Sequence, residues 1–364
     1  MSLTGMYREA LPPAQRPGEG SIAICMATYN PEPTMLRQQI RSIQAQSVED
    51  WLCFISDDSS TPDFFQNLVA EIRGDDRFVL SQAPQRLGVY RNFERALSMV
   101  PAGINYVALS DQDDDWFPNK LAVLRDHLHR PGVQLAYSDF RIVDERGAVV
   151  ADSLWRSRKN SFERVDLLGV FNTVTGAAAM FPRELLTRAL PFPPMLGAAW
   201  HDHWLTLLAL SRGELAYVDE ALFDHVHHGR NVSGDIFNKM PGRRRLRLPR
   251  RRSAEATLDL YRHHYLFGVR YIENLAEHLQ ARVGSQASRD KQCQIDRLVH
   301  LSRSSRSLAW VTTLAAHRLR PDDFMPSRSR DLLRGILYAR ASRWAGSVSR
   351  ARSAPDTTRP EGAL

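Results

Sequence analysis

Four short apolar runs alternate with helix-like segments in the first part of the chain, and this alternation limits the fold more than any other feature. The runs are residues 21–27, 51–56, 77–82 and 105–110. Their lengths, and their content of Ile, Val and Leu, are typical of buried parallel strands. Apolar residues such as Leu36 and Ile40 follow at helical spacing, with Thr34 as the expected N-cap. The pattern predicts a Rossmann-like, mostly parallel sheet with helices on both faces.

The remaining chain predicts further α/β elements and then a change of character. We expect a strand in 133–144, a strand or loop and then a helix near Pro182 in 168–186, an apolar helix at 201–212 and a strand pair in 214–229. Arg-rich amphipathic helices follow at 254–279 and 329–348. The predicted division is a lead-in at 1–20, an α/β domain at 21–235 and a basic, mainly helical C-terminal region at 236–364.

Composition excludes several classes of protein. Hydrophobic residues make up 43% of the 364, which is enough for an ordinary core. The three cysteines are too few and too scattered for a disulfide framework or a zinc site, and Cys25 and Cys53 lie in apolar runs as core residues would. This cysteine usage suggests a cytoplasmic location. Residues 1–20 lack the apolar core of a signal peptide, and no apolar run reaches the ~18 residues of a spanning helix.

The net charge of +7 is concentrated late in the chain, where residues 243–252 hold seven arginines. Such a run could contact nucleic acid, attract anionic lipid head groups at about 1 kcal/mol per Arg, or serve as a solvated linker. The amphipathic helices that follow contain Trp, Tyr and Leu, which favours a membrane surface. We therefore expect an anionic membrane surface, and no nucleic acid, as the partner of 243–252.

Polar residues follow three of the predicted strands, where open parallel sheets bind their ligands. Thr28 and Tyr29 follow the first strand, and Asp57 and Asp58 the second. The two aspartates could cap a helix or form a turn, or they could accept hydrogen bonds from a nucleobase or ribose. The glycine-rich phosphate-binding motif of dinucleotide folds is absent after the first strand, which argues against a dehydrogenase.

Four acidic residues, Asp111, Asp113, Asp114 and Asp115, follow the predicted strand at 105–110. Like charges at this spacing cost free energy unless a cation or a ligand neutralises them. A D-x-D spacing on an extended segment can aim alternate carboxylates at one point, and Mg²⁺ or Mn²⁺ prefers such oxygens. A solvated acidic turn is the alternative interpretation.

Two histidine-containing motifs follow. Asp202, in "HDHW" at 201–204, could be the N-cap of an apolar helix or a general base that deprotonates a hydroxyl. The second motif is the group His225, His227 and His228, in which one member could bind a metal.

Three ordered segments resemble the family 2 inverting glycosyltransferases. They are "ICMATYNPEPTMLRQQIRSIQAQSVEDWLCFISDDSST", "LGVYRNFERAL" and "YVALSDQDDDWFPNKL". The run "SDQDDDW" is most similar to a bacterial branch that includes rhamnosyltransferases and other O-antigen or exopolysaccharide enzymes. The resemblance covers roughly residues 20–235 and implies a GT-A fold. It also implies transfer of one sugar from a UDP-, dTDP- or GDP-linked donor to a glycan or lipid-linked acceptor in cell-surface polysaccharide synthesis.

The resemblance implies roles for individual positions. The nucleotide-sugar pocket would be formed by Thr28, Tyr29, Asp57, Asp58, Arg91, Asn92 and Asp111. The Mg²⁺ or Mn²⁺ ligands would be Asp111, Asp113 and His228, with Asp113 the direct ligand and Asp114 in support. Asp202 matches the catalytic base, which would drive a single, inverting displacement.

The chain also departs from the family pattern. The Q-x-x-R-W motif and spanning helices of processive synthases are absent, which favours single-sugar transfer at the inner face of the plasma membrane. Ser59 replaces a glycine of the family's D-D-G-S turn, and Val226 and His227 replace Arg-Gln. The alternative is a non-catalytic nucleotide-sugar-binding scaffold, although such a protein would not need Asp111, Asp113 and Asp202 together. A nucleotidyltransferase is disfavoured because the first strand lacks a Gly-rich loop.

Overall fold

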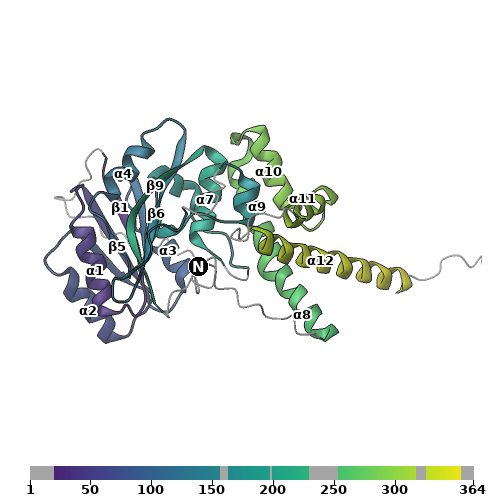
Figure 1. Cartoon of the computed structure of the whole chain (residues 1–364), viewed down its shortest axis with the longest axis horizontal. Helices are drawn as coiled ribbons and strands as arrows, with labels where there is room; N and C mark the ends of the chain where they lie inside the picture. The colour runs from purple at the N-terminus through teal and green to yellow at the C-terminus, as the bar shows by residue number, and fades with distance from the viewer. Residues whose placement is uncertain (1–19, 156–162, 197–198, 229–252, 317–324, 354–364) are drawn as a thin grey trace, which may run out of the picture.

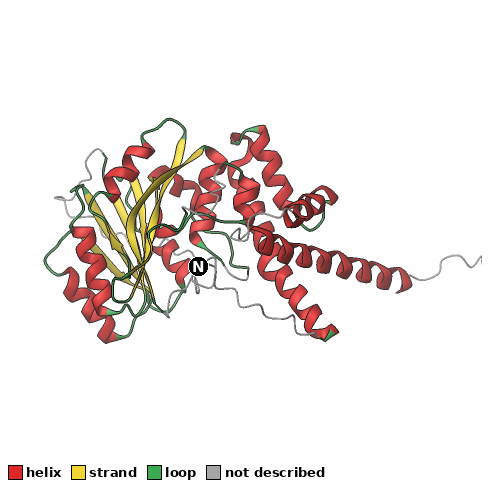
Figure 2. Ribbon diagram, in the orientation of Figure 1, coloured by secondary structure: helices red, strands yellow, loops and turns green. Residues whose placement is uncertain are grey.

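The computed structural model describes residues 20–155, 163–196, 199–228, 253–316 and 325–353 as a mixed α/β body with a helical C-terminal part (Figures 1 and 2). The basic run 243–252 and all of the lead-in except Gly20 lie outside the described residues. The strands are β1 (Ile22–Thr28), β2 (Trp51–Asp57), β3 (Phe78–Gln82), β4 (Tyr106–Ser110), β5 (Asp115–Trp116), β6 (Val133–Asp144), β7 (Val149–Ala151), β8 (Ala179–Pro182) and β9 (Glu214–His227).

The helices fall into two groups along the chain. Those of the α/β body are α1 (Pro33–Gln44), α2 (Pro62–Ile72), α3 (Val89–Ser98), α4 (Lys120–Leu128), α5 (Val165–Val170), η3 (Gly176–Ala178), η4 (Arg183–Leu185), α6 (Leu186–Ala189) and α7 (His201–Arg212). Those of the C-terminal part are α8 (Ala254–His264), η6 (Tyr265–Val269), α9 (Arg270–Val283), η7 (Gly284–Gln286), α10 (Arg289–Val299), α11 (Ser305–Ala316) and α12 (Met325–Ser353).

One sheet organises the body, in the order β3-β2-β1-β4-β8-β6-β9-β5, with β7 paired to β6. The strands β3, β2, β1 and β4 are parallel, whereas β8 is antiparallel to both of its neighbours. The predicted parallel sheet is confirmed for this half, and all seven residues of β2 are buried, as its apolar sequence requires. The carboxyl ends of β1, β2 and β4 therefore meet at one edge.

Two local predictions were wrong. Residues 214–227 form a single strand instead of a strand pair, because an irregularity in the pairing with β6 moves the register from Val218 to Ala221. The polar pair Asp219–Glu220 lies in this irregularity, where a turn would otherwise be expected. Helix α1 is capped by Glu32, whose side chain accepts a hydrogen bond from the Met35 amide, so the helix begins ahead of Thr34.

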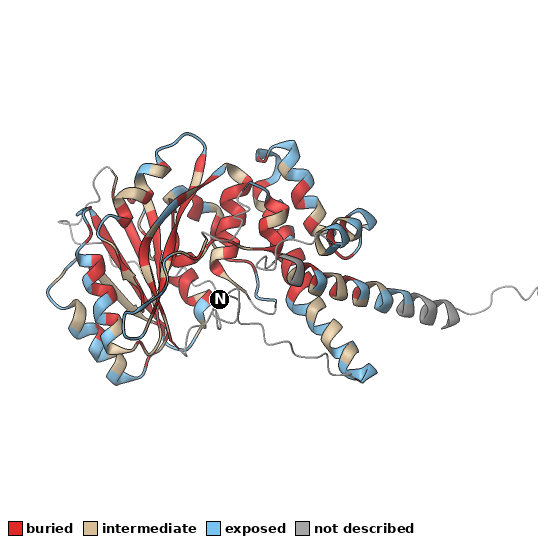
Figure 3. Cartoon of the chain, viewed as in Figure 1, coloured by how far each residue is buried: buried red, intermediate tan, exposed pale blue. Residues whose placement is uncertain are grey.

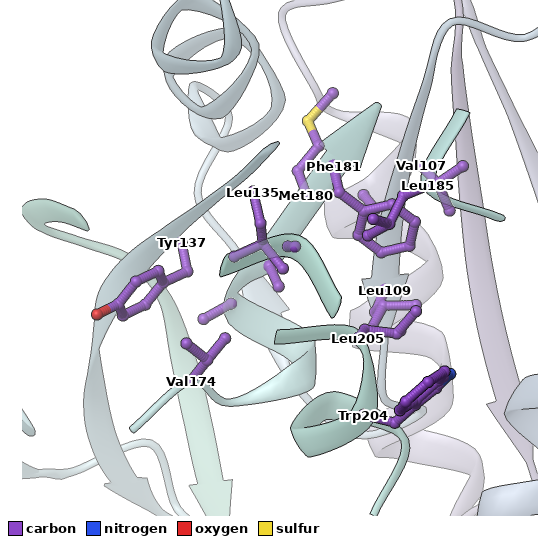
Figure 4. Close-up of a cluster of buried hydrophobic side chains, with 14 of the residues drawn as sticks. Val107, Leu109, Leu135, Tyr137, Val174, Met180, Phe181, Leu185, Trp204 and Leu205 are labelled. Atoms are coloured by element: carbon purple, nitrogen blue, oxygen red, sulfur yellow. The ribbon is translucent and has the colours of Figure 1, made fainter. Parts of the chain in front are cut away.

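The core extends from the sheet into α7 and the C-terminal helices (Figure 3). Figure 4 shows Val107 and Leu109 of β4, Phe181 of β8 and Trp204 and Leu205 of α7 in one buried cluster. Burying each of these side chains contributes about 1.5–3 kcal/mol. Helix α7 is thereby fixed to the middle of the sheet, and its first turn lies near the carboxyl edge of β4.

The C-terminal helices pack on the body through α9 and α10. The Val165 amide at the start of α5 donates to the side chain of Gln294 in α10 at 2.8 Å. The Lys291 ammonium, also in α10, donates to the Gly213 carbonyl at 2.6 Å. Helices α8 and α12 extend away from the sheet (Figure 1). No helix in the described part of the chain is long and apolar enough to cross a membrane.

Candidate active site

The carboxyl ends of β1 and β2 hold each other through Asp57. This carboxylate is fully buried and accepts hydrogen bonds from the Thr28 hydroxyl at 3.0 Å and from Gln82 Nε2 at 3.0 Å. It also accepts from the Ser60 hydroxyl at 2.6 Å and the Ser60 amide at 2.9 Å. Asp57 therefore closes the turn after β2, as the turn interpretation anticipated.

Asp58 is buried at the same edge and fixes the start of α3. Its two oxygens accept from the Leu87 amide at 2.5 Å and the Gly88 amide at 2.9 Å. Gly88 has φ +83°, a backbone conformation that glycine adopts without strain. Ser59 has φ +62°, so it keeps the left-handed conformation expected of the glycine that it replaces. The turn after β2 therefore retains its left-handed residue despite the substitution.

Helix α3 supports the two strand ends. The Asn92 side chain donates to the Ser56 carbonyl at 2.8 Å and to the Thr28 carbonyl at 3.2 Å, and it accepts from the Ser56 hydroxyl at 2.6 Å. Arg91 instead forms an ion pair with Glu94. Asn92 therefore joins β1 to β2, whereas the described contacts of Arg91 lie on the opposite side, toward the segment before α7.

Tyr29 connects β1 to the acidic cluster. Its amide donates to Gln112 Oε1 at 2.8 Å, and Gln112 is the residue between Asp111 and Asp113. The guanidinium of Arg86 lies 4.0 Å from the centre of the Tyr29 ring, at cation–π distance. The pair presents a flat, positively charged surface beside the strand ends. Neither Gln112 nor Arg86 was among the predicted site residues.

The acidic cluster meets two histidines of β9 and its end. His228 Nε2 lies 2.8 Å from Asp113 Oδ2, and His225 Nδ1 lies 2.9 Å from Asp114 Oδ1. Positions more than 100 residues apart in the chain are thus brought together. Asp113 and His228, two of the predicted metal ligands, are thus in contact. His225, which was one of three candidate histidines, also lies against the cluster.

Burial and mutual repulsion perturb this cluster. Burial, with the neighbouring Asp114 and Asp113, raises the pKa of Asp111 to about 8. Burial also raises the pKa of Asp114, although its bond to His225 opposes the shift. Burial lowers the pKa of His225, but the hydrogen bond and charge of Asp114 outweigh it and raise that pKa to about 9. Burial and the neighbouring carboxylates therefore disfavour ionisation of Asp111 and Asp114 in the absence of a cation.

The side chains of the acidic cluster fit a cation whose coordination shell is completed by a bound substrate. Among the described residues, no three His, Cys, Asp or Glu side chains are arranged to hold a metal ion by themselves. Mg²⁺ and Mn²⁺ commonly bind one or two carboxylates together with substrate phosphates, so a complete protein cage is not required. Asp114 Oδ2 is buried without a hydrogen-bond partner in the described chain. This orphaned oxygen and the raised pKa of Asp111 both favour a cation.

Asp202 lies in the first turn of α7, one residue inside the helix. The N-cap is Trp200, so the N-cap interpretation of Asp202 was wrong. Burial raises the pKa of Asp202 to about 6, and its Oδ1 accepts from the His203 amide at 2.6 Å. Asp202 also contributes to the raised pKa of Asp111, so the two carboxylates are close enough to interact electrostatically.

Two buried residues connect the acidic cluster to the Asp202 region. The Lys120 ammonium is fully buried, lies 3.7 Å from the centre of the Trp116 ring and donates to the Ala177 carbonyl at 2.6 Å. Beside Ala177, a Cβ on Gly176 would lie 2.7 Å from His201 Nε2 and 3.5 Å from Asp202 Cβ. Glycine is therefore required for the close approach of η3 to α7. The sequence gives no local signal for either role.

Parts of the chain are similar to known proteins. Residues 23–189 match the family model described as Glycosyl transferase family 2. The uncharacterized glycosyltransferase MJ1057 of Methanocaldococcus jannaschii is 20% identical over 191 residues, which are 52% of this chain and 64% of the relative. The uncharacterized protein y4gI of Sinorhizobium fredii is 28% identical over 134 residues, which are 35% of this chain and 14% of the relative.

The chain thus spans less than two thirds of either relative. Among solved structures, residues 1–349 of S. aureus TarS in complex with UDP-GlcNAc match with a TM-score of 0.52 at 15% identity, over 89% of this chain and 92% of that one. The mannosyltransferase PcManGT of Pyrobaculum calidifontis, in complex with GDP-Man and Mn²⁺, matches with a TM-score of 0.48 at 15% identity, over 89% and 87%. The likeness to TarS confirms the predicted GT-A fold.

Proposed function

We propose that this protein is an inverting glycosyltransferase that moves one sugar from a nucleoside-diphosphate sugar to an acceptor hydroxyl. The observation that carries the proposal is the position of Asp202. This half-buried carboxylate has its pKa raised to about 6 and lies within electrostatic reach of the acidic cluster at the carboxyl edge. A base thus stands beside a site suited to a diphosphate, within a chain whose residues 23–189 match a glycosyl transferase family.

The nucleoside would bind against the ends of β1 and β2. Tyr29 and Arg86 offer a flat cationic surface on which a base can stack. Asp57 and Asn92 hold the strand ends in place through their buried hydrogen bonds. Thr28 and Asp58 complete the proposed donor pocket, in which Asp58 fixes the Leu87–Gly88 amides. Arg91, which was also predicted for this pocket, instead contacts the Phe192 and Pro193 carbonyls.

The diphosphate would bind at the acidic cluster together with a cation. Asp111, Asp113 and His228 are the proposed ligands of Mg²⁺ or Mn²⁺; they do not surround a cation by themselves, so the diphosphate would complete the set. Asp114 supports them through His225. When bound, such a cation neutralises the diphosphate and the charge that grows on it as the sugar leaves. Lys120, at the start of α4, holds η3 beside this site through its bond to the Ala177 carbonyl.

Asp202 would act as the general base. Its pKa of about 6 leaves it mostly ionised at neutral pH, and it remains basic enough to accept a proton from a hydroxyl. As the proton moves to Asp202, the acceptor oxygen attacks the anomeric carbon from the face opposite the leaving diphosphate. This single displacement inverts the configuration and needs no covalent sugar–enzyme intermediate.

Release of nucleoside diphosphate from a panel of donors tests the proposal. The panel holds UDP-, dTDP- and GDP-sugars, including UDP-GlcNAc, each with Mn²⁺ or Mg²⁺ and with glycan or lipid-linked acceptors. We expect metal-dependent release from one donor, lost in Asp113→Ala and Asp202→Ala and retained in Asp115→Ala. Donor binding by calorimetry without turnover on any acceptor would favour the scaffold alternative. Neither binding nor turnover would refute the proposal.

We also propose that the acceptor is presented at an anionic membrane surface, as in cell-surface polysaccharide synthesis on the cytoplasmic side. Exposed apolar side chains gather on the C-terminal helices, among them Leu258 at 59% and Trp344 at 71% exposure. Together with the basic run 243–252, they give this part the composition of an interfacial anchor.

Vesicle sedimentation of the full chain tests the membrane proposal. We expect binding to vesicles with anionic lipid, little binding to neutral ones, and a loss in Leu258→Ser with Trp344→Ser. Val149→Ser on β7, where the side chain is 49% exposed, is the matched control and should bind normally. Equal binding to both kinds of vesicle, or to neither, would contradict the membrane proposal.

A further inference from the structure

The imidazole of His203, directly after the proposed base, is held in one orientation. The ring is buried, with Nε2 2.9 Å from the Leu168 carbonyl and Nδ1 3.0 Å from the Tyr271 hydroxyl. Burial lowers the pKa of His203 to about 4, so the ring is neutral. A carbonyl only accepts, so Nε2 carries the proton and Nδ1 accepts from Tyr271. Both ring nitrogens are thereby satisfied.

The Tyr271 side chain lies close to the proposed base as well as to His203. The tyrosine is buried, and the charge of Asp202 contributes to its raised pKa, which places the two side chains close together. Tyr271 is thus bonded to His203 and lies within electrostatic reach of Asp202.

His203 transmits this restraint to the carboxylate. Asp202 Oδ1 accepts from the His203 amide at 2.6 Å, so movement of His203 would reorient Asp202. Tyr271 lies in α9, beyond the family-matched segment 23–189 and beyond the predicted α/β domain. The orientation of Asp202 therefore depends on a residue of the C-terminal helices.

Helix α9 makes a second connection to the same edge. The segment 190–196 runs between α6 and α7, and Asn274 of α9 donates to its Pro194 carbonyl at 3.0 Å. On the other side, the Tyr90 hydroxyl of α3 donates to the Pro193 carbonyl at 3.1 Å. The C-terminal helices are thereby coupled to both the base helix α7 and the donor-side helix α3.

We propose that Tyr271 is a positioning residue that acts through His203 to orient Asp202, and that α9 is consequently part of the catalytic module. The inference rests on the proposed role of Asp202 as the base. A base displaced by about 1 Å can lose roughly 100-fold in rate, whereas the donor pocket at β1 and β2 does not depend on this bond. The expected signature is thus a loss in kcat without a loss in donor affinity.

Steady-state kinetics of Tyr271→Phe in the full chain tests the inference. The substitution removes one oxygen and keeps the ring. We expect kcat to fall roughly 10- to 100-fold while KM for the donor and the calorimetric Kd of the nucleoside diphosphate with Mn²⁺ stay within about twofold. Tyr265→Phe, in the same continuous helix, loses the same atom away from His203 and should match the wild type.

A double-mutant cycle separates positioning from a general loss of structure. If Tyr271 acts through His203, Tyr271→Phe should cost little further kcat in a His203→Gln background. Equal losses in both backgrounds, or a fall in kcat matched by a fall in donor affinity and Tm, would overturn the inference. An unchanged kcat in Tyr271→Phe, with Asp202→Asn inactive, would overturn the role of Tyr271 and leave the proposed function standing. A wild type without transfer activity, or a fully active Asp202→Asn, would overturn the proposed function as well.

Discussion

Replacement of Asp111 by asparagine should stabilise the metal-free protein while abolishing its activity. The pKa of Asp111 is raised to about 8 by burial and by Asp114 and Asp113, from an ordinary value of 3.8. The folded state therefore binds more protons than the unfolded chain between about pH 4 and pH 8. Folding stability consequently falls as the pH rises through this window. The Asp111→Asn variant has no charge to accommodate at this position and should show no such fall.

The size of the effect follows from the pKa difference. A shift of one pKa unit corresponds to about 1.4 kcal/mol, so a shift of about four units sets a ceiling of about 6 kcal/mol at pH 8. Because Asp113 and Asp114 share the repulsion and Asp111 is only half-buried, we expect roughly half of it, about 3 kcal/mol. For a chain of this length that corresponds to a rise in Tm of roughly 4–6 °C.

The assay is thermal unfolding in EDTA at pH 8 and pH 5, by calorimetry. The Tm of Asp111→Asn should exceed that of the wild type by the full amount at pH 8 and by much less at pH 5. Addition of Mn²⁺ with a nucleoside diphosphate should raise the Tm of the wild type and leave the variant unchanged. Asp115→Asn is the matched control, since its carboxylate lies in the same acidic run but accepts from exposed Gln38.

The same comparison can refute the reasoning. If Asp111→Asn is no more stable than the wild type at pH 8, or if its advantage is equal at both pH values, repulsion does not act on Asp111 as described. If Asp115→Asn gives an equal rise, the effect belongs to net charge and not to the site.

Three further predictions concern the base and its surroundings. First, kcat should rise with pH through about 6, because Asp202 must be ionised to accept a proton; a pH–rate profile flat between pH 5 and 8 would contradict this. Second, Gly176→Ala should lower kcat with donor Kd unchanged, because its Cβ would crowd His201; kinetics and calorimetry compare the two. Third, Lys120→Met should lose about 1–3 kcal/mol in urea unfolding, because the buried Ala177 carbonyl loses its donor; an unchanged midpoint would show that bond to be dispensable.

Much of the α/β half was predictable because its signals are local. The apolar run at 51–56 needed only its own residues to indicate a buried strand, and β2 spans Trp51–Asp57. The helix predicted at 201–212 has those boundaries, since its apolar residues continue without a break. The location of the acidic residues beyond a strand end followed from the parallel sheet alone.

The failures came from contacts that no local pattern contains. Asp219–Glu220 resembles a turn, yet the pairing with β6 continues on both sides of it. The hydrogen bonds of Asp58 to the Leu87 and Gly88 amides, 29 and 30 residues later, were equally invisible in the local sequence. The link between His203 and Tyr271 joins residues 68 positions apart, so neither residue alone indicates it.

Donor binding and turnover measured on one preparation of Asp202→Asn test the central claim most directly. The substitution keeps the shape of the side chain and removes its ability to accept a proton. The account predicts donor Kd within about twofold of the wild type and a loss of turnover of roughly 100-fold or more, with Tm maintained. Turnover close to the wild type, with donor binding intact, would show that Asp202 is not the base and would contradict the account.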